Sequence, residues 1–453
     1  MTLPPLLSTP WWLEEAPPDP AAAPLARDVV ADVAIVGGGY CGLWTALALR
    51  ARDPDLRIAL VEAERCGHGP SGRNGGFLHG YWSALASLCG VVGDAGAIEV
   101  ARASTGAVEA VRGLTEDVWL REAGMLKVSA APAQDAAVES SVAAAIEVGM
   151  PEEAVPLSAA EVRERISSPV FRAGVFFRDG ATVQPARLAR ALRRAALAAG
   201  IDLYEHTPAT RVRESSVETP HGVIRASRVV LAVNSAAANW RPLARRLTNF
   251  SSYVVLTEPV PQLLAEIGWT QGEAVIDGRM FLHYFRATDD GRVLMGSGSG
   301  PVGRGFTDDV PSARRAEAGL RRLLPQLADA RVERAWGGPI DVSADRFPFV
   351  GTARGIHYAA GFSGNGVGPA WLAAQALASL ALDADDEWSR LPLVNRPLRR
   401  GLPPEPLKRL GGSVVRRAIM AIEEAEERER EGPAWARAAA ATPRLLGIRL
   451  GLR

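Results

Sequence analysis

The chain has 453 residues, of which 47% are hydrophobic and 23% charged, a composition that predicts a folded protein of two or three structural units. Lys plus Arg equals Asp plus Glu at 51 each, so net charge indicates neither a nucleic-acid partner nor a membrane surface. Cys41, Cys66 and Cys89 are too few and too scattered for a disulfide framework, and the six histidines stand singly, without metal-ligand spacing. The N-terminus lacks a signal pattern and no apolar run reaches about 18 residues, so we expect a cytoplasmic protein with no integral membrane segment.

The first 27 residues form an arm rich in Pro and Ala. The prolines forbid a long regular element here. Trp11 and Trp12 stand in the middle of the arm, and we expect them to pack it onto the body of the protein.

The stretch 32–62 has the order of a dinucleotide-binding unit, with an apolar run, a glycine turn, a helix, a second apolar run and an acidic residue. Gly37 permits the tight turn, Gly39 lets the backbone approach a pyrophosphate, and Gly42 lets the helix lie close to the strand. The helix N-terminus offers N–H groups to the phosphates. Glu62, about 20 residues after Gly42, could accept bonds from the ribose hydroxyls and would repel a 2′-phosphate, which favours FAD or NAD over NADP. The alternative is a plain strand–helix–strand crossover with a glycine-rich turn.

A second glycine-rich segment follows at 67–77, with its tightest part at 71–76. Such a loop lets backbone N–H groups crowd an anionic or flat polar ligand. Ser71 and Arg73 could reach a pyrophosphate, whereas the alternative is a flexible surface loop.

The middle of the chain alternates predicted helices and strands. We expect its second strand–helix–strand set to complete the nucleotide sheet and to bring backbone of Val212 near an adenine. The predicted helices are 94–115, 132–148 and 185–199, and the predicted strands are 125–128, 174–177, 201–204, 229–233 and a short hairpin at 209–212 and 222–224.

Residues 251–300 change to a β pattern, with strands at 253–256, 280–285 and 292–295 and a turn at 289–291. We expect a separate antiparallel sheet that forms the wall of a substrate pocket. Tyr253, His283 and Tyr284 on this sheet are candidate proton acceptors, although plain packing is the alternative for each. The basic segment 311–324 predicts a helix with a solvated face.

A second glycine turn lies at a strand–helix junction more than 300 residues after the first. A strand at 357–360 leads into the glycine-rich run 361–368 and a helix at 371–382, whose N-terminus could stabilise negative charge on a bound ring. Beyond residue 400, a helix at 414–430 carries Val415, Ile419 and Ile422 on one stripe. This stripe predicts docking on the body, and a partner or a membrane surface is the alternative.

With these motifs the chain resembles the D-amino-acid-oxidase-like FAD oxidoreductases, and among them the γ-glutamylputrescine oxidase-like branch, over roughly 32–382. The resemblance rests on the 37–42 turn with Glu62, the 71–76 loop, the Trp-Gly-Gly stretch at 336–348 and the 361–366 run, and the 11–13 arm also looks like that branch. It implies an α/β fold, in which a Rossmann-like FAD-binding domain is joined to a discontinuous antiparallel-sheet substrate domain. The implied division is an N-terminal arm at 1–27, an FAD-binding domain at 28–90, 150–240 and 335–400, a substrate domain at 91–149 and 241–334, and a C-terminal helical tail at 401–453.

The resemblance also implies hydride transfer from the carbon of a C–N bond to flavin, hydrolysis of the imine product, and reduction of O2 to H2O2. Amino-acid oxidases of this family carry a carboxylate-binding Arg where this chain has Ile340 and Asp341, so an amine substrate fits better, and Asp341 could attract an ammonium group or make a structural hydrogen bond. No Cys follows Cys89, so we expect non-covalent FAD. The 292–295 strand lacks the Lys that helps some relatives activate O2, so His283 or Arg286 could supply the positive charge, or another acceptor replaces O2.

The readings that remain open are an FAD-dependent dehydrogenase with another acceptor, a flavin monooxygenase, and an FAD-binding subunit of a larger oxidase. The oligomeric state is also left open. The candidate catalytic residues are His283, Tyr253 and Tyr284 of the pocket sheet, and Asp341. The candidate FAD-binding residues are Gly37, Gly39, Tyr40, Cys41, Gly42, Glu62, Ala63, Ser71, Gly72, Arg73, Asn74, Gly75, Gly76, Val212, Gly361, Gly364, Asn365, Gly366 and Val367.

Overall fold

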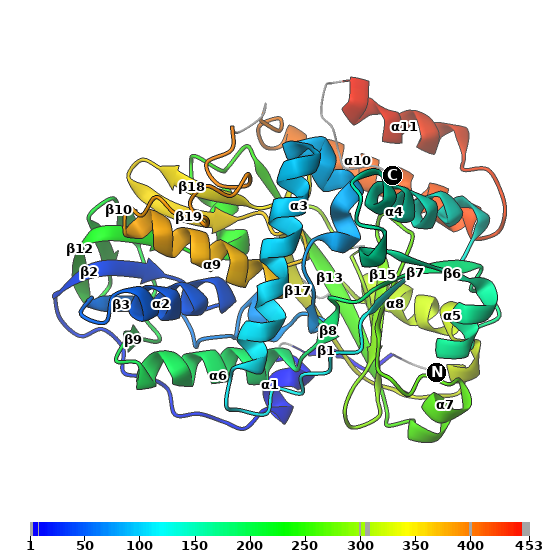
Figure 1. The fold of residues 1–453 in the computed structure, drawn as a ribbon, viewed down its shortest axis with the longest axis horizontal. Coiled ribbons are helices and arrows are strands. Elements are labelled where there is room, and N and C mark those ends of the chain that lie inside the picture. Colours follow the sequence, from blue (N-terminus) through cyan, green and yellow to red (C-terminus); the bar gives the residue numbers. More distant parts are fainter. Residues whose placement is uncertain (1–2, 8, 299, 304–308, 398–400, 446–453) are drawn as a thin grey trace.

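The computed structural model describes residues 3–7, 9–298, 300–303, 309–397 and 401–445. Two large β-sheets lie side by side, with helices packed against both (Figure 1). A long helix, α3 (Leu85–Arg112), runs between the two halves in this view and bends at Gly93. The α/β fold with a second, largely antiparallel sheet confirms the expected fold class.

Parallel strands β2 (Val29–Val36) and β3 (Ile58–Val61) form the centre of the eight-stranded sheet, and α2 (Tyr40–Arg52) connects them. β2 also pairs in parallel with β12 (Gly222–Leu231), whose last residues pair in parallel with β19 (Ile356–Ala360). All four residues of β3 are buried, as in a parallel sheet covered on both faces. The remaining strands are β9 (Asp202–Tyr204), β10 (Arg211–Arg213), β11 (Ser216–Thr219) and β18 (Phe349–Ala353).

Three helices, α2, α6 (Pro185–Ala198) and α9 (Val367–Ala381), pack against one face of this sheet. Pro185 occupies the first turn of α6, and the Gln184 side chain accepts the N–H of Arg187 at 2.8 Å, which fixes where the helix begins. Predicted strands at 222–224 and 229–233 are one strand, β12. Its continuity was hidden because exposed Arg225 and Ser227 alternate with buried neighbours.

The nine-stranded sheet has the order β1-β17-β13-β16-β15-β14-β5-β7-β6. Its pairs are antiparallel except β1–β17 and β14–β5. The predicted strands and the turn at 289–291 are present, although the strand predicted at 280–285 begins at His283, whereas β1, β6, β14 and β17 were not predicted. The strands are β1 (Leu6–Leu7), β5 (Met125–Ser129), β6 (Val155–Ser158), β7 (Ala173–Phe177), β13 (Leu247–Thr257), β14 (Ala274–Asp277), β15 (His283–Ala287), β16 (Val293–Ser297) and β17 (Val332–Ser343).

Helix α8 (Val310–Leu323) packs against β13 and β16 of the larger sheet. Its Ala316 and Leu320 are fully buried, so the basic segment has one buried face as well as the solvated face that we expected. The other elements are α1 (Trp11–Glu15), α4 (Asp135–Glu147), α5 (Ala159–Arg165), α7 (Pro261–Glu266), a small ribbon of β4 (Phe77–Leu78) with β8 (Ala181–Thr182), and 3-10 turns at Pro70–Gly72, Trp82–Ala84, Pro132–Gln134, Pro151–Glu153, Asn234–Asn239 and Pro325–Leu327.

Sheet membership differs from the expected domain boundaries at two places. β6 and β7 follow residue 150 but pair with β5 in the nine-stranded sheet, and β17 begins near residue 335 in that same sheet. The apolar alternation of these strands does not tell which sheet they join, because either sheet would bury one of their faces. A division into two domains remains a proposal, with 155–177 and 332–343 moved to the substrate side.

One stretch, Trp82–Arg112, is long and apolar enough to cross a membrane by length and composition. In the fold it contacts α4 and α9, and its Leu88, Val100 and Ala101 are fully buried. A core helix of a folded domain has the same length and composition.

The tail forms two helices, α10 (Leu407–Glu426) and α11 (Ala434–Leu445), which lie against each other. α10 docks on the nine-stranded sheet through ion pairs from Arg279 to Glu423 at 3.2 Å and to Glu427 at 2.8 Å. The stripe that includes Ile419 faces the body, as expected, although the helix begins seven residues before the predicted start at 414.

Candidate active site

The first glycine corner joins β2 to α2 within four residues. Gly37 has φ 112°, and a Cβ there would lie 2.3 Å from the carbonyl oxygen of Ala232. A Cβ on Gly42 would lie 1.9 Å from the carbonyl oxygen of Gly37. Only glycine fits these two positions, because each carries backbone on the side where a side chain would project.

Backbone N–H groups at this corner point toward few protein acceptors. The N–H of Gly38 donates to Glu62 Oε2 at 2.7 Å, and that of Tyr40 donates to Ser71 Oγ at 3.0 Å. Within the described chain, the N–H groups of Cys41 and Gly42 have no acceptor, as expected in the first turn of a helix. Burial raises the pKa of Glu62, and the N–H groups that it accepts partly oppose this shift. The corner therefore offers free donors to an anion such as a phosphate.

Two tryptophans anchor the glycine-rich loop that follows β3. Trp336 Nε1 donates to the carbonyl oxygen of Arg73, and Trp12 Nε1 donates to that of Asn74, each at 2.9 Å. The two indole rings meet edge to face at 6.0 Å. Asn74 also accepts the N–H of Gly76 through its side chain at 2.8 Å. The N-terminal arm and β17 together hold this loop in place.

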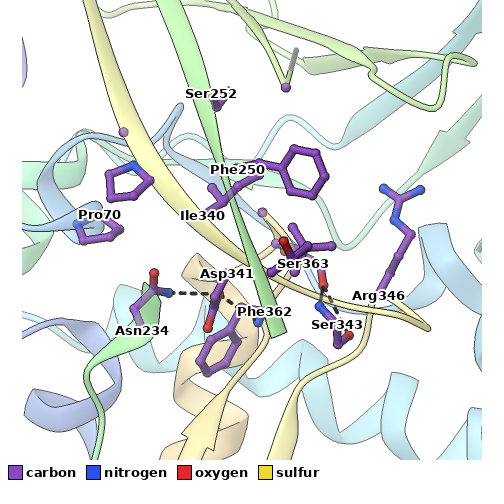
Figure 2. A pocket seen from close by; sticks show the side chains of 18 of the residues that line it. Pro70, Asn234, Phe250, Ser252, Ile340, Asp341, Ser343, Arg346, Phe362 and Ser363 are labelled. Carbon is purple, nitrogen blue, oxygen red and sulfur yellow. Dashed lines mark hydrogen bonds between the residues drawn. The ribbon is translucent and has the colours of Figure 1, made fainter. Parts of the chain in front are cut away.

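The second glycine corner, which joins β19 to α9, is fastened to β17 by Asp341. This buried carboxylate accepts the N–H groups of Gly361 and Phe362 and the side-chain amide of Asn234 (Figure 2). Burial raises its pKa to about 6, against the lowering effect of these bonds. Gly361 and Gly364 have φ of 85° and 90°, so the corner needs glycine there. Asp341 makes the structural bonds that were one of its two predicted roles.

Both corners border one cavity of about 1390 Å³. The cavity reaches from the first corner past the glycine-rich loop to the face of β13, β15 and β17 in the larger sheet. The predicted FAD-binding residues in its wall are Gly37, Gly39, Tyr40, Cys41, Glu62, Ala63, Ser71, Arg73, Asn74, Gly75, Gly364, Asn365, Gly366 and Val367.

A family model described as FAD dependent oxidoreductase (DAO) matches residues 32–380 of the chain. The chain belongs to the DAO family of FAD-dependent oxidoreductases. It is 30% identical over 397 residues to the "Probable oxidoreductase OrdL" of Rhizobium meliloti (strain 1021), which covers 83% of this chain and 89% of that protein. It is 28% identical over 389 residues to the γ-glutamylputrescine oxidoreductase of Escherichia coli (strain K12), covering 81% of this chain and 88% of that protein.

The fold of this DAO-family enzyme is also that of a solved glycine oxidase. The crystal structure of glycine oxidase from Geobacillus kaustophilus superposes with a TM-score of 0.67 at 22% identity and covers 83% of this chain and 100% of that chain. The expected resemblance to FAD oxidoreductases is therefore confirmed by both sequence and fold.

The cavity of the DAO-family enzyme has features that fit FAD. The α2 N-terminus presents unpaired N–H groups beside the carboxylate of Glu62. Two buried polar atoms in the wall, Asn365 Oδ1 and Thr248 Oγ1, have no hydrogen-bond partner in the described part of the chain. Buried polar atoms are rarely left unpaired in folded proteins, so these atoms indicate a polar ligand in the cavity.

Five of the predicted FAD-binding residues do not line the cavity. Four of them are glycines of the turns that lie outside the cavity wall, at positions where a Cβ would meet backbone or packed side chains. These are Gly42, Gly72, Gly76 and Gly361. Val212 lies in β10, paired with Val217, and is not among the residues that line the cavity, so its approach to an adenine stays a prediction. The wall at that end is formed by 207–209, the residues that leave β9 before the β10–β11 ribbon begins.

Two of the four candidate catalytic residues face away from the cavity. Tyr284 and Asp341 line it, whereas Tyr253 and His283 do not. His283 Nδ1 is bonded to Asp277 Oδ2 at 2.7 Å, and its ring lies against Gly319 of α8 on the opposite face of the sheet. Successive residues of a strand point to opposite faces, so His283 and Tyr284 cannot both face the cavity.

Several wall residues were not predicted from the sequence. Phe250 and Ser252 share the cavity face of β13, and the same alternation would have indicated them once the register was known. Arg346 follows the end of β17 and carried no recognisable signal. The wall also includes residues of the tail, namely Leu407, Val415 and Ile419 of α10 and Thr442 and Pro443 of α11.

Across the described residues, no group of three or more His, Cys, Asp and Glu side chains is arranged to hold a metal ion.

Proposed function

We propose that this enzyme oxidises a C–N bond of a small amine and passes the electrons to O2, giving H2O2. The observation that carries the proposal is the cavity bordered by both glycine corners and by a sheet face with Phe250 and Tyr284. FAD, when bound, supplies the acceptor for a hydride from the carbon of the C–N bond. The imine product then hydrolyses to an aldehyde or keto compound.

Different parts of the chain would bind different parts of FAD. The α2 N-terminus would bind the phosphates, Glu62 the ribose, the 71–76 loop the flavin side and the 364–367 backbone the pyrimidine edge. No Cys follows Cys89, which supports non-covalent attachment. We place the enzyme in the cytoplasm, in keeping with its three free cysteines.

The names of the relatives support an amine or amino-acid-like substrate. They include γ-glutamylputrescine oxidoreductase and glycine oxidase. Ile340 lines the cavity at the place where the family's amino-acid oxidases carry a carboxylate-binding Arg, so an α-carboxylate would find no cation there. This favours an amine whose reacting carbon carries no carboxylate.

The proton of the substrate ammonium group has no strong acceptor among the candidate residues. The hydroxyl of Tyr284 is bonded to Ser252 at 2.8 Å, and burial raises the pKa of Tyr284 to about 12. The carboxylate of Asp341 is occupied by backbone N–H groups and Asn234. We therefore propose that the ammonium loses its proton to water rather than to a protein base.

An anaerobic reduction screen tests the proposed function. Purified protein should be yellow, and its flavin absorbance should bleach with one class among polyamines, N-methyl amines, amino acids and aminophosphonates. Rapid recovery of colour on admitting air, with H2O2 formed in equal amount, is expected for an oxidase. Recovery only with an artificial acceptor would instead identify a dehydrogenase, and a yellow protein that no amine bleaches would indicate a non-catalytic FAD-binding subunit.

A further inference from the structure

Six cationic side chains line the described wall of the cavity, and five of them have partners. Arg73 Nε donates to the carbonyl oxygen of His68, Lys127 Nζ to that of Ala137, and Lys408 Nζ to that of Ala244. Arg279 is paired with two glutamates, and the negative charge of Asp309 acts on Arg416. The sixth cation is Arg346.

Arg346 has no hydrogen bond or ion pair from its guanidinium group to any residue that the structure describes. Its nearest acidic neighbour in sequence, Asp345, is bonded to Arg396 at 3.0 Å and so does not neutralise it. The side chain of Arg346 lines the cavity and is accessible from it. The protein that encloses the cavity lowers the pKa of Arg346. Figure 2 shows the guanidinium extending away from Ser343 on the same side as the Phe250 ring.

The acidic groups of the wall do not balance this charge, since each is already engaged. Glu62 accepts two backbone N–H groups, and Asp277 is bonded to the ring and the backbone of His283. Asp341 accepts two backbone N–H groups and the amide of Asn234. A guanidinium that opens on an enclosed cavity without a counter-charge favours an anionic partner, so the cavity is complementary to a ligand with an anionic group.

We propose that Arg346 binds a carboxylate of the substrate, so that the substrate is an amine that also carries a carboxylate. This inference rests on the proposed function and names the substrate class for the same cavity. The planar guanidinium offers two parallel N–H donors that match the two oxygens of a carboxylate. Arg346 stands six residues after Ile340, beyond the end of β17, and holds the carboxylate at a different part of the wall from Ile340.

Binding of a substrate fragment to the oxidised holoenzyme tests this role without any turnover. Sodium butanoate and its neutral isostere butanamide are titrated while the flavin absorption spectrum is recorded. R346Q should weaken butanoate binding about 10- to 100-fold, the range expected when a charged hydrogen-bond partner is lost, and change butanamide binding less than threefold. R346K keeps the charge without the planar fork and should lie between the two.

The matched control is R354Q. Arg354 is also an exposed arginine with a positive φ, 52° against 69° for Arg346, but it lies in the β18–β19 turn outside the cavity wall. R354Q should bind both probes as the wild type does. FAD content and thermal midpoint report whether each variant folds, and if R346Q binds no FAD, R346K must still weaken butanoate selectively.

Two results would overturn the assignment of Arg346. These are equal affinities of the wild type for butanoate and butanamide, and equal butanoate affinities in the wild type and R346Q. In the second case, a shifted flavin spectrum in R346Q would place the guanidinium against the cofactor. Selective butanoate binding through Arg346 in an enzyme that oxidises no amine would instead overturn only the proposed function.

Discussion

Replacement of Trp12 by Phe tests whether the N-terminal arm supports the FAD site. Trp12 is fully buried, and its Nε1 donates to the carbonyl oxygen of Asn74 in the glycine-rich loop. The variant leaves that buried carbonyl without its donor, at a cost of about 1–3 kcal/mol. The smaller ring also leaves a void beside Trp336, at a further cost of about 1–2 kcal/mol. We expect the free energy of unfolding of the holoenzyme to fall by about 2–5 kcal/mol, where the range is the sum of these two terms.

Urea unfolding of the holoenzyme and titration of the apoprotein with FAD measure the two consequences. FAD affinity should fall as well, because the loop then keeps only one of its two indole N–H bonds, the one from Trp336 to Arg73. W435F is the control, since Trp435 is 57% exposed on α11, and it should change the unfolding free energy by less than about 0.5 kcal/mol. A W12F variant as stable as W435F, with wild-type FAD affinity, would refute the argument.

Three further predictions concern the two corners and the cavity wall. G42A should purify without FAD, because its Cβ would lie 1.9 Å from the carbonyl oxygen of Gly37, whereas G90A, at a position with open space, should retain FAD. Y284F should lower kcat/KM less than tenfold, since the hydroxyl is bonded to Ser252 and stays protonated at neutral pH; a larger loss with an altered pH profile would show that it moves a proton. The pKa of Asp341 is raised to about 6 in the fold, so its contribution to stability is present below its ordinary pKa near 3.8 and is lost as pH rises through 6, by about 3 kcal/mol in all. In D341N apoprotein, unfolding free energy measured from pH 4 to pH 7 should therefore fall less steeply than in the wild type, and equal slopes would contradict the raised pKa.

The glycine corners were predictable because each has a local sequence signature with a steric cause. A tight turn between a strand and a helix demands glycine at Gly37 and Gly42, and this demand is visible without knowledge of the rest of the fold. Most strands and the longer helices other than α11 were predictable for the same reason, since apolar periodicity records which face is buried.

The cavity face of the larger sheet was not predictable, because it depends on register across strands far apart in sequence. Tyr253 and His283 carry groups that can accept a proton, but they point to the face of the sheet that is opposite the cavity. The pairing of β13, β15 and β16 shows that Ser252 and Tyr284 share the cavity face. The position of Val212 depended in the same way on the unpredicted strand β11. Local patterns give a strand its two faces but do not say which one meets a ligand.

The two helices of the tail lie beyond the stretch 32–380 that the family shares, yet they form part of the wall around the ligand. Substitutions in 401–445 can therefore change which molecules are admitted while the nucleotide-binding framework stays as it is. Divergence within the family can therefore proceed through the tail, with the nucleotide-binding framework inherited intact.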